Sequence, residues 1–226
     1  MSAIVDDNTK SSTSSISDNH NHNHNDKLVT ITNPDVEVTL PNLKYGYRTT
    51  KASWNELVQI IQIEYDIPKL SRSRIQQHDY EVFRYHMKEQ YSSSLDYILI
   101  SKFGFDAVVP VPVVSSHKEV DKNPNKINNK WLAKPFLENV DSSKILLIEN
   151  DFPYYVEDNI VHYVLWKIKE PLTQQEILDA REELQTEKIK ALDILQWVNP
   201  PNLKSIPEID HVHFLCRLWI YSIVCR

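Results

Sequence analysis

The chain contains two glycines, Gly46 and Gly104, among its 226 residues. A Walker A loop and a dinucleotide-binding fingerprint each require several glycines, because the backbone must approach phosphate groups closely. Neither motif can form here, and the sequence also has no G-x-S-x-G elbow and no H-E-x-x-H zinc motif. These features argue against an α/β-hydrolase, an NTP-driven kinase of the usual loop types and an NAD-dependent dehydrogenase.

The composition predicts a globular cytoplasmic protein. Hydrophobic residues make up 41% of the chain. The net charge of −6 argues against a nucleic-acid partner, although it leaves room for a local basic pocket. The apolar stretch from His213 to Cys225 is too short to span a membrane and contains Arg217, and the polar residues 1–27 do not form a secretory signal. Without a CxxC pair, Cys216 and Cys225 are expected to be reduced thiols.

Two regions follow from the distribution of apolar residues. Residues 1–27 form a polar Ser/Asn/His-rich tail that should be disordered, because it has almost nothing to bury. Its alternating run from His20 to Asn25 favours a low-complexity repeat over a metal-binding tract. Residues 28–226 are predicted to form a single α+β domain, with a mixed or antiparallel sheet and packed helices.

The periodicity of apolar residues predicts the elements of that domain. Strands are expected over 28–40, 144–149, 161–168 and 209–215, and helices over 53–67, about 72–91 and 173–196. Ser53 with Glu56, and Thr173 with Glu176, have the spacing of capping boxes. Ile75 is expected on the core side of the second helix, and Trp54, Trp131, Trp166 and Trp197 in the core.

The triplet His211-Val212-His213 is the strongest candidate for chemistry. Residues i and i+2 of a strand project to the same side, about 6.5 Å apart. Two neutral imidazoles at that spacing suit nucleophilic or acid–base work on a phosphoryl group. A structural role is the alternative, either as two polar residues on a half-exposed strand or as one core histidine bonded to a carbonyl.

Further residues are candidate contacts to an anionic substrate. Arg72 and Arg74 lie near the start of the second helix, where cations and free N–H groups can hold a phosphate; a solvated basic turn is the competing interpretation. His162 lies on another predicted strand and can line the same cavity if the two strands pair. The predicted substrate-binding set is His162, Asn199, Lys204, Arg72, Arg74 and Arg217.

Most of the chain resembles the fungal N-acetylglucosamine-induced protein 1 family. The similarity covers about residues 45–217 and rests on several runs. They are Ser53-Trp54-Asn55-Glu56-Leu57, Leu70-Ser71-Arg72-Ser73, Asn150-Asp151-Phe152-Pro153-Tyr154, Asn199-Pro200, Lys204-Ser205-Ile206-Pro207 and His211-Val212-His213. The resemblance implies a cytoplasmic protein linked to N-acetylglucosamine metabolism, and it brings no assigned reaction.

Residues 144–217 are also similar to histidine-triad proteins in the order of their elements. By that match His213 would be the nucleophile, His211 would assist, and Asn199 would contact the phosphate. The chain departs from the triad pattern at Leu215, where those proteins have a third histidine, and it lacks the glycine before the histidine strand.

Three functions remain open from the sequence. The first is an enzyme acting on a phosphorylated or UDP-linked amino sugar through His211 and His213, without a cofactor. The second is a non-catalytic sensor or adaptor that binds such a metabolite or a protein partner of unknown identity. The third is a metal protein using His162, His211 and His213, since three histidines make a usual catalytic zinc shell.

Overall fold

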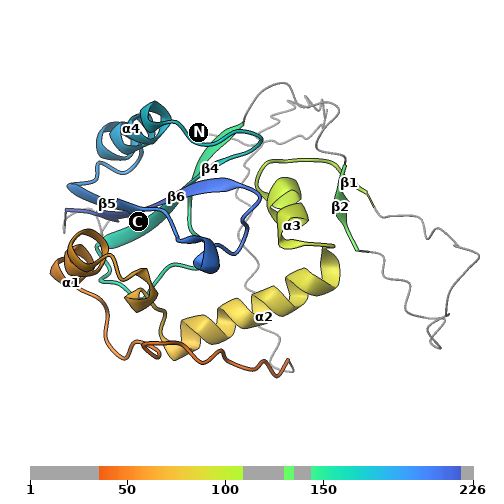
Figure 1. The fold of residues 1–226 in the computed structure, drawn as a ribbon, viewed down its shortest axis with the longest axis horizontal. Coiled ribbons are helices and arrows are strands. Elements are labelled where there is room, and N and C mark those ends of the chain that lie inside the picture. The colour runs from red at the N-terminus through yellow and green to blue at the C-terminus, as the bar shows by residue number, and fades with distance from the viewer. Residues whose placement is uncertain (1–35, 109–129, 135–143, 220–226) are drawn as a thin grey trace, which may run out of the picture. The chain divides into compact units, whose positions relative to one another are not determined.

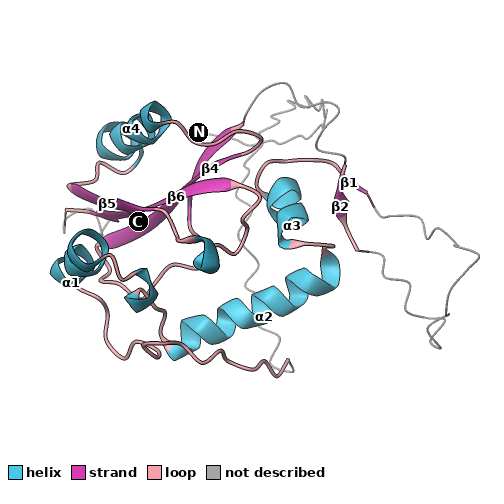
Figure 2. Ribbon diagram, viewed as in Figure 1, coloured by secondary structure: helices cyan, strands magenta, loops and turns pink. Residues whose placement is uncertain are grey.

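The computed structural model describes residues 36–108, 130–134 and 144–219. The predicted tail of residues 1–27 lies outside these ranges. Helices and antiparallel strands form one α+β arrangement, which confirms the predicted fold class. Figure 1 traces the chain, and Figure 2 separates its helices from its strands. Within the described ranges, no helix combines the length and apolar character needed to cross a membrane.

A four-stranded antiparallel sheet is the centre of the fold. Its strands are β3 (Ile145–Glu149), β4 (Ile160–Lys167), β5 (Asp193–Trp197) and β6 (Asp210–Arg217), in the order β3-β4-β6-β5. The predicted histidine strand is therefore β6, and it is hydrogen-bonded to a neighbour on each side. A separate two-stranded sheet pairs β1 (Ala107–Val108) with β2 (Leu132–Ala133).

Helices cover both faces of the large sheet. α4 (Gln174–Glu183) and the π-helical turn Leu184–Lys188 pack on one face, against a cluster that includes Leu165 and Phe214. α1 (Trp54–Val58), with the π-helical turn Gln59–Glu64, and α3 (Ser94–Ser101) pack on the other face. α2 (Arg74–Gln90) contacts α3. In Figure 1 the sheet runs between α4 and α1. Because side chains alternate along a strand, one face of β6 packs under α4 and the other carries the histidines.

One predicted helix ends early, and a strand takes its place. The pattern predicted a helix over 173–196, but α4 and its π-helical turn end at Lys188, and β5 occupies 193–197. Lys190 has φ of 53°, a left-handed conformation that usually calls for glycine. The chain therefore turns at a lysine, which the pattern of turn-forming residues does not reveal.

Several smaller expectations were also wrong. Ile75 is 75% exposed and Trp131 is 43% exposed, whereas the other three tryptophans placed in the core are buried. Of the strand predicted over 28–40, residues 36–40 form no strand, and residues 28–35 lie outside the described ranges. Ser53 accepts a hydrogen bond from the backbone N–H of Glu56, but the Glu56 carboxylate pairs with Arg48 at 2.8 Å instead of returning to the cap.

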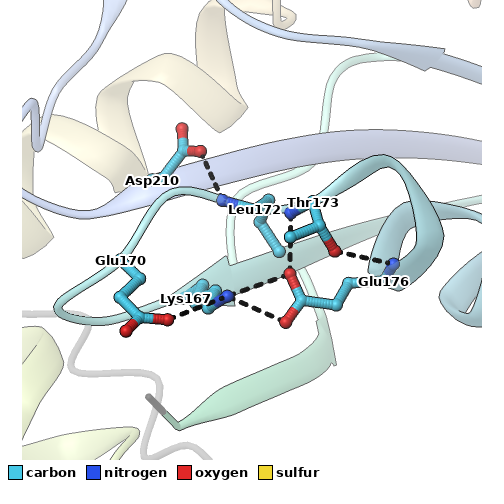
Figure 3. A network of polar contacts seen from close by, with 6 residues as sticks. All are labelled: Lys167, Glu170, Leu172, Thr173, Glu176 and Asp210. Carbon is cyan, nitrogen blue, oxygen red and sulfur yellow. Dashed lines mark hydrogen bonds and ion pairs between the residues drawn. The ribbon is translucent and has the colours of Figure 1, made fainter. Parts of the chain in front are cut away.

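The capping box predicted at the start of α4 is present, and it extends into a polar network shown in Figure 3. The Glu176 carboxylate accepts from the Thr173 backbone N–H and, at 2.8 and 3.0 Å, from the ammonium group of Lys167. One carboxylate oxygen of Asp210 accepts from the Leu172 backbone N–H at 2.9 Å, and the other accepts from the His211 backbone N–H at 3.1 Å. The segment before α4 is thereby attached to the first residue of the histidine strand.

Candidate functional site

A cavity of about 300 Å³ lies between the histidine face of the sheet and the α2–α3 pair. Both histidines of β6 line it, together with Arg72 just before α2 and Asn199 after β5. Aromatic side chains from several helices, strands and loops also line the cavity: Tyr80, Phe83, Tyr97, Phe152, Tyr154 and Trp166. An apolar wall with a few convergent polar groups is the usual make-up of a small-molecule site.

The sheet register explains why the histidines face the cavity together. His211 lies opposite Trp166 of β4, and His213 lies opposite Val164 of β4 and Trp197 of β5. The Trp197 ring stacks on His213, with the ring centroids 4.9 Å apart. Both histidines are buried, at 1% and 7% exposure, but they border a cavity with polar groups and are not enclosed in an apolar core.

Both ring nitrogens of His213 have partners. The Trp197 indole N–H donates to Asn199 Oδ1 at 3.0 Å, so the amide nitrogen of Asn199 must face His213 Nε2, 3.1 Å away. An amide nitrogen only donates, so His213 Nε2 accepts and the ring carries its proton on Nδ1. That N–H donates to His162 Nε2 at 3.1 Å. His213 is therefore held in one tautomer by a chain of hydrogen bonds.

The His162 ring also has neighbours besides His213. Tyr154 stacks on it, with centroids 5.3 Å apart. Asn150 Nδ2 lies 3.2 Å from Nδ1 and 3.5 Å from Nε2 of His162, so its contact is shared between the two ring nitrogens and, unlike the contact of Asn199, selects neither tautomer. Asn150 Oδ1 accepts from the Phe152 backbone N–H at 3.0 Å, which fixes the direction of the amide.

His211 has a different environment from His213. Its Nδ1 donates to the Ile209 carbonyl oxygen at 2.9 Å, which leaves a lone pair on Nε2 of the neutral ring. No described residue hydrogen-bonds to that Nε2. Among the described residues that are not exposed, one side-chain nitrogen or oxygen is both sealed from solvent and without a hydrogen bond, and it is His86 Nε2. Because His211 Nε2 also has no hydrogen bond but is a different atom, it is not sealed from solvent.

Burial keeps all three imidazoles neutral. Desolvation and the nearby positive charge of Arg72 lower the pKa of His162 from 6.5 to about 3. Desolvation also lowers the pKa of His213, to well below its ordinary value, and the pKa of His211. Neutral imidazoles offer lone pairs at neutral pH, as a nucleophile or hydrogen-bond acceptor requires.

Arg72 is a cation at the cavity with no carboxylate within ion-pair distance among the described residues. Its Nε and Nη2 donate to the Phe152 carbonyl oxygen at 3.1 and 2.7 Å, and Nη1 donates to Gln77 at 3.3 Å. The guanidinium lies 4.3 Å from the centroid of the Tyr80 ring. Burial lowers the pKa of Arg72, yet a guanidinium stays charged in proteins. Two of its five N–H donors remain for a ligand.

Two further cations line the cavity, and each already has a carboxylate partner. Arg84 pairs with Glu81 at 3.1 Å, and Lys102 pairs with Asp151 at 2.5 Å. An anion bound here would therefore find at Arg72 a cation without a contacting carboxylate among the described residues, although the charge of Glu81 also acts on it.

The structure brings some of the predicted substrate-binding residues to the cavity and leaves others away from it. Arg72 and Asn199 line the cavity, and His162 lies behind His213. Lys204 lies beside the site, 3.6 Å from Asp210, and its charge contributes to the lowered pKa of His211. Arg74 and Arg217 do not line it.

Arg74 is exposed at the first residue of α2. Arg217 lies about 13 Å along β6 from His213 and pairs with Asp193, above the ring of Trp54.

Sequence reasoning assigned no site role to Asn150, Phe152, Tyr154 or Trp197, which hold or cover the histidines and Arg72. The run Asn150-Asp151-Phe152-Pro153-Tyr154 is part of the family resemblance, and that was the available signal. The three-histidine metal site does not form: in residues 36–108, 130–134 and 144–219, no group of three or more His, Cys, Asp or Glu side chains is arranged to hold a metal ion.

The fold and site define an α+β protein with a histidine-lined cavity beneath two helices. Residues 53–217 match the model of the family described as "Protein of unknown function (DUF3605)", and the chain belongs to this family. No curated protein matches the chain. A solved structure described as "Crystal Structure of HTC1" is similar at 21% sequence identity and a TM-score of 0.45, over 78% of this chain and 88% of that one.

Proposed function

We propose that this protein binds a small phosphorylated amino sugar in the histidine-lined cavity and acts on its phosphoryl group through β6. The observation that carries the proposal is Arg72. A charge withdrawn from water is costly unless it is paired, and the half-buried Arg72 has spare donors and no carboxylate within ion-pair distance among the described residues. A phosphate oxygen would satisfy it, with guanidinium geometry suited to bidentate contact.

The neighbouring groups support a phosphate at this point. Neutral His211 and His213 add no positive charge of their own, so Arg72 would supply the charge and the imidazoles the lone pairs. Asn199 and Ser205 add polar groups, and the aromatic wall is suited to the apolar side of a sugar ring. The resemblance to the N-acetylglucosamine-induced family suggests the sugar and a cytoplasmic location. The resemblance to histidine-triad proteins suggests phosphoryl or nucleotidyl chemistry.

The size of the cavity favours the smaller of the candidate substrates. About 300 Å³ is at the lower end of the range for small-molecule pockets. A sugar monophosphate is therefore favoured over a UDP-linked sugar, which carries a nucleoside and a second phosphate in addition.

A thermal-shift screen tests the binding part of the proposal. The full chain is mixed with N-acetylglucosamine, its 6-phosphate, its 1-phosphate or its UDP derivative. A ligand at 100 times its Kd stabilises the native state by about 2.7 kcal/mol, or about 5–10 °C for a domain of this size. A monophosphate should give the largest shift and the free sugar the smallest.

Two arginine variants two residues apart provide the matched control. Arg72→Gln removes the cavity cation and should abolish the shift with monophosphates. Arg74→Gln removes an exposed arginine at the start of the same helix and should retain it. Equal shifts in both variants would show that the ligand does not use the cavity, and no shift with any sugar would reject the amino-sugar assignment.

A binding protein without turnover is the second candidate. It is favoured by His213, whose two ring nitrogens are both engaged in hydrogen bonds. Phosphorus NMR after long incubation separates the two functions. Release of inorganic phosphate supports the enzyme, and intact ligand in the presence of a thermal shift supports the sensor.

A further inference from the structure

We propose that His211, and not His213, presents the reacting imidazole nitrogen at this site, and that His213 is a positioning residue. The inference rests on the proposed function for the chemical class of the ligand. It reverses the roles that the similarity to histidine-triad proteins implies for the two residues.

The hydrogen bonds of the two rings lead to this assignment. A nitrogen attacks with its lone pair, and His213 has one available lone pair, on Nε2. That lone pair already accepts from Asn199, whose amide is oriented by Trp197. His211 has its lone pair on Nε2 with no partner among the described residues, and its side chain lines the cavity, although only 1% of the residue is exposed.

The backbone contact of His211 also suits a nucleophile. When Nε2 forms a bond to phosphorus, the ring gains positive charge. The Nδ1–H group would then donate more strongly to the Ile209 carbonyl oxygen, which is already 2.9 Å away. The contact therefore strengthens as charge develops, and interactions of that kind lower a barrier. The Nδ1–H of His213 donates instead to the ring nitrogen of another imidazole, His162 Nε2, so it does not face a backbone carbonyl oxygen as His211 does.

In a transfer reaction, the Nε2 lone pair of His211 forms a nitrogen–phosphorus bond. The bond from phosphorus to the sugar oxygen breaks, its electron pair leaves with that oxygen, and the oxygen takes a proton from water. The hydroxide left behind attacks the phosphohistidine phosphorus, and the nitrogen–phosphorus electron pair returns to Nε2. The net reaction is hydrolysis of the ester to sugar and inorganic phosphate. Arg72 would hold the non-bridging oxygens throughout.

His213 would act through its position. A series of hydrogen bonds of 3.0 to 3.1 Å connects β5, β6 and β4 by way of Trp197, Asn199, His213 and His162. His213 packs edge-to-face against His211, with ring centroids 5.3 Å apart. It therefore limits the rotation of the His211 ring and fixes the direction of its free nitrogen.

Acylation by diethyl pyrocarbonate tests the assignment on the full chain, without a need for turnover. The reagent modifies an unprotonated imidazole nitrogen, and peptide mass spectrometry locates each modified histidine. At pH 7, His211 should react about tenfold faster than His213, because one hydrogen bond must break before the His213 lone pair is free. His78, whose side chain is 51% exposed, is the internal positive control.

Two substitutions at Asn199 sharpen the comparison. Asn199→Ala removes the donor to His213 and should raise the His213 rate toward that of His211. Asn199→Asp still accepts from Trp197 and would also accept from His213 Nε2, so the His213 lone pair moves to Nδ1, which faces the His162 ring, and its rate should stay low. Because both variants lose the original amide, a melting curve of each confirms that the fold persists.

The outcomes separate this proposal from the proposed function. Faster reaction at His213, or no reaction at His211 after complete reaction at His78, would overturn the assignment. Faster reaction at His211, with protection by N-acetylglucosamine 6-phosphate, supports both proposals. Faster reaction at His211 without protection by any sugar phosphate supports the free nitrogen and rejects the sugar phosphate as the ligand.

Discussion

The buried histidine His162 should make the folded state sensitive to acid. Its pKa is lowered to about 3 in the folded protein by desolvation and by the charge of Arg72. In the unfolded chain the same imidazole takes up a proton near pH 6.5. Between these values the unfolded state binds more protons, so the free energy of unfolding decreases as the pH falls below about 6.5.

The size of the effect follows from the two pKa values. At pH 5 the unfolded imidazole is protonated about 30 to 1, while the folded one is almost entirely neutral. That ratio corresponds to about 2 kcal/mol of lost stability between pH 8 and pH 5, from this one residue. The result is nearly the same for any folded pKa below about 4, because the unfolded chain then accounts for almost all of the proton uptake.

Urea unfolding followed by tryptophan fluorescence at pH 8 and pH 5 measures this loss. The comparison is between the wild type and His162→Gln, whose side-chain carbonyl can still accept from His213. The variant should lose about 2 kcal/mol less than the wild type over that pH range. His78→Gln, which removes a half-exposed histidine, is the matched control for loss of an imidazole.

The difference between variants is the decisive quantity, since contributions from other titrating groups largely cancel in it. If His162→Gln loses as much stability between pH 8 and pH 5 as the wild type does, His162 is not held neutral in the folded state. The description of the site as a set of neutral imidazoles would then be wrong.

Three further predictions concern the scaffold under the site, and each is measured by urea unfolding at neutral pH. Leu184→Ala should cost about 2–5 kcal/mol, because this side chain of the π-helical turn after α4 is fully buried; a cost below 1 kcal/mol would contradict that packing. Thr173→Ala should cost about 1 kcal/mol through loss of the N-cap, and Thr173→Ser should restore most of it. Asp210→Ala should cost about 1–3 kcal/mol, since Leu172 N–H loses its acceptor, whereas unchanged stability would show that water replaces the carboxylate.

The sequence predicted the histidine strand because its signal is local. Alternation alone places His211 and His213 on one side of β6, and the structure has them there. The cation near the start of α2 was also predicted, but local reasoning did not separate Arg72 from Arg74. Arg72 donates to the Phe152 carbonyl oxygen, and Arg74 is exposed.

The remaining parts of the site depend on which strands are neighbours. Asn150 follows β3, and Asn199 follows β5, yet both contact the histidines because the strand order is β3-β4-β6-β5. The order of strands in a sheet depends on contacts between residues far apart in the sequence. It could not be inferred here, because most of β5 was predicted to be part of a helix. Residues 184–197 contain no glycine or proline, so nothing in their composition marked the change from helix to strand.

The position of β6 between two partner strands has a consequence for how a ligand would enter. Backbone amides of a strand paired on both sides exchange slowly with solvent, because opening them requires much of the sheet to unfold. The opposite wall is attached differently: Arg72 binds the Phe152 carbonyl oxygen, and the rings of Tyr80 and Phe83 contact that of Phe152. Access to the cavity would thus come from movement of the helical wall, with the histidine strand β6 as the stationary part.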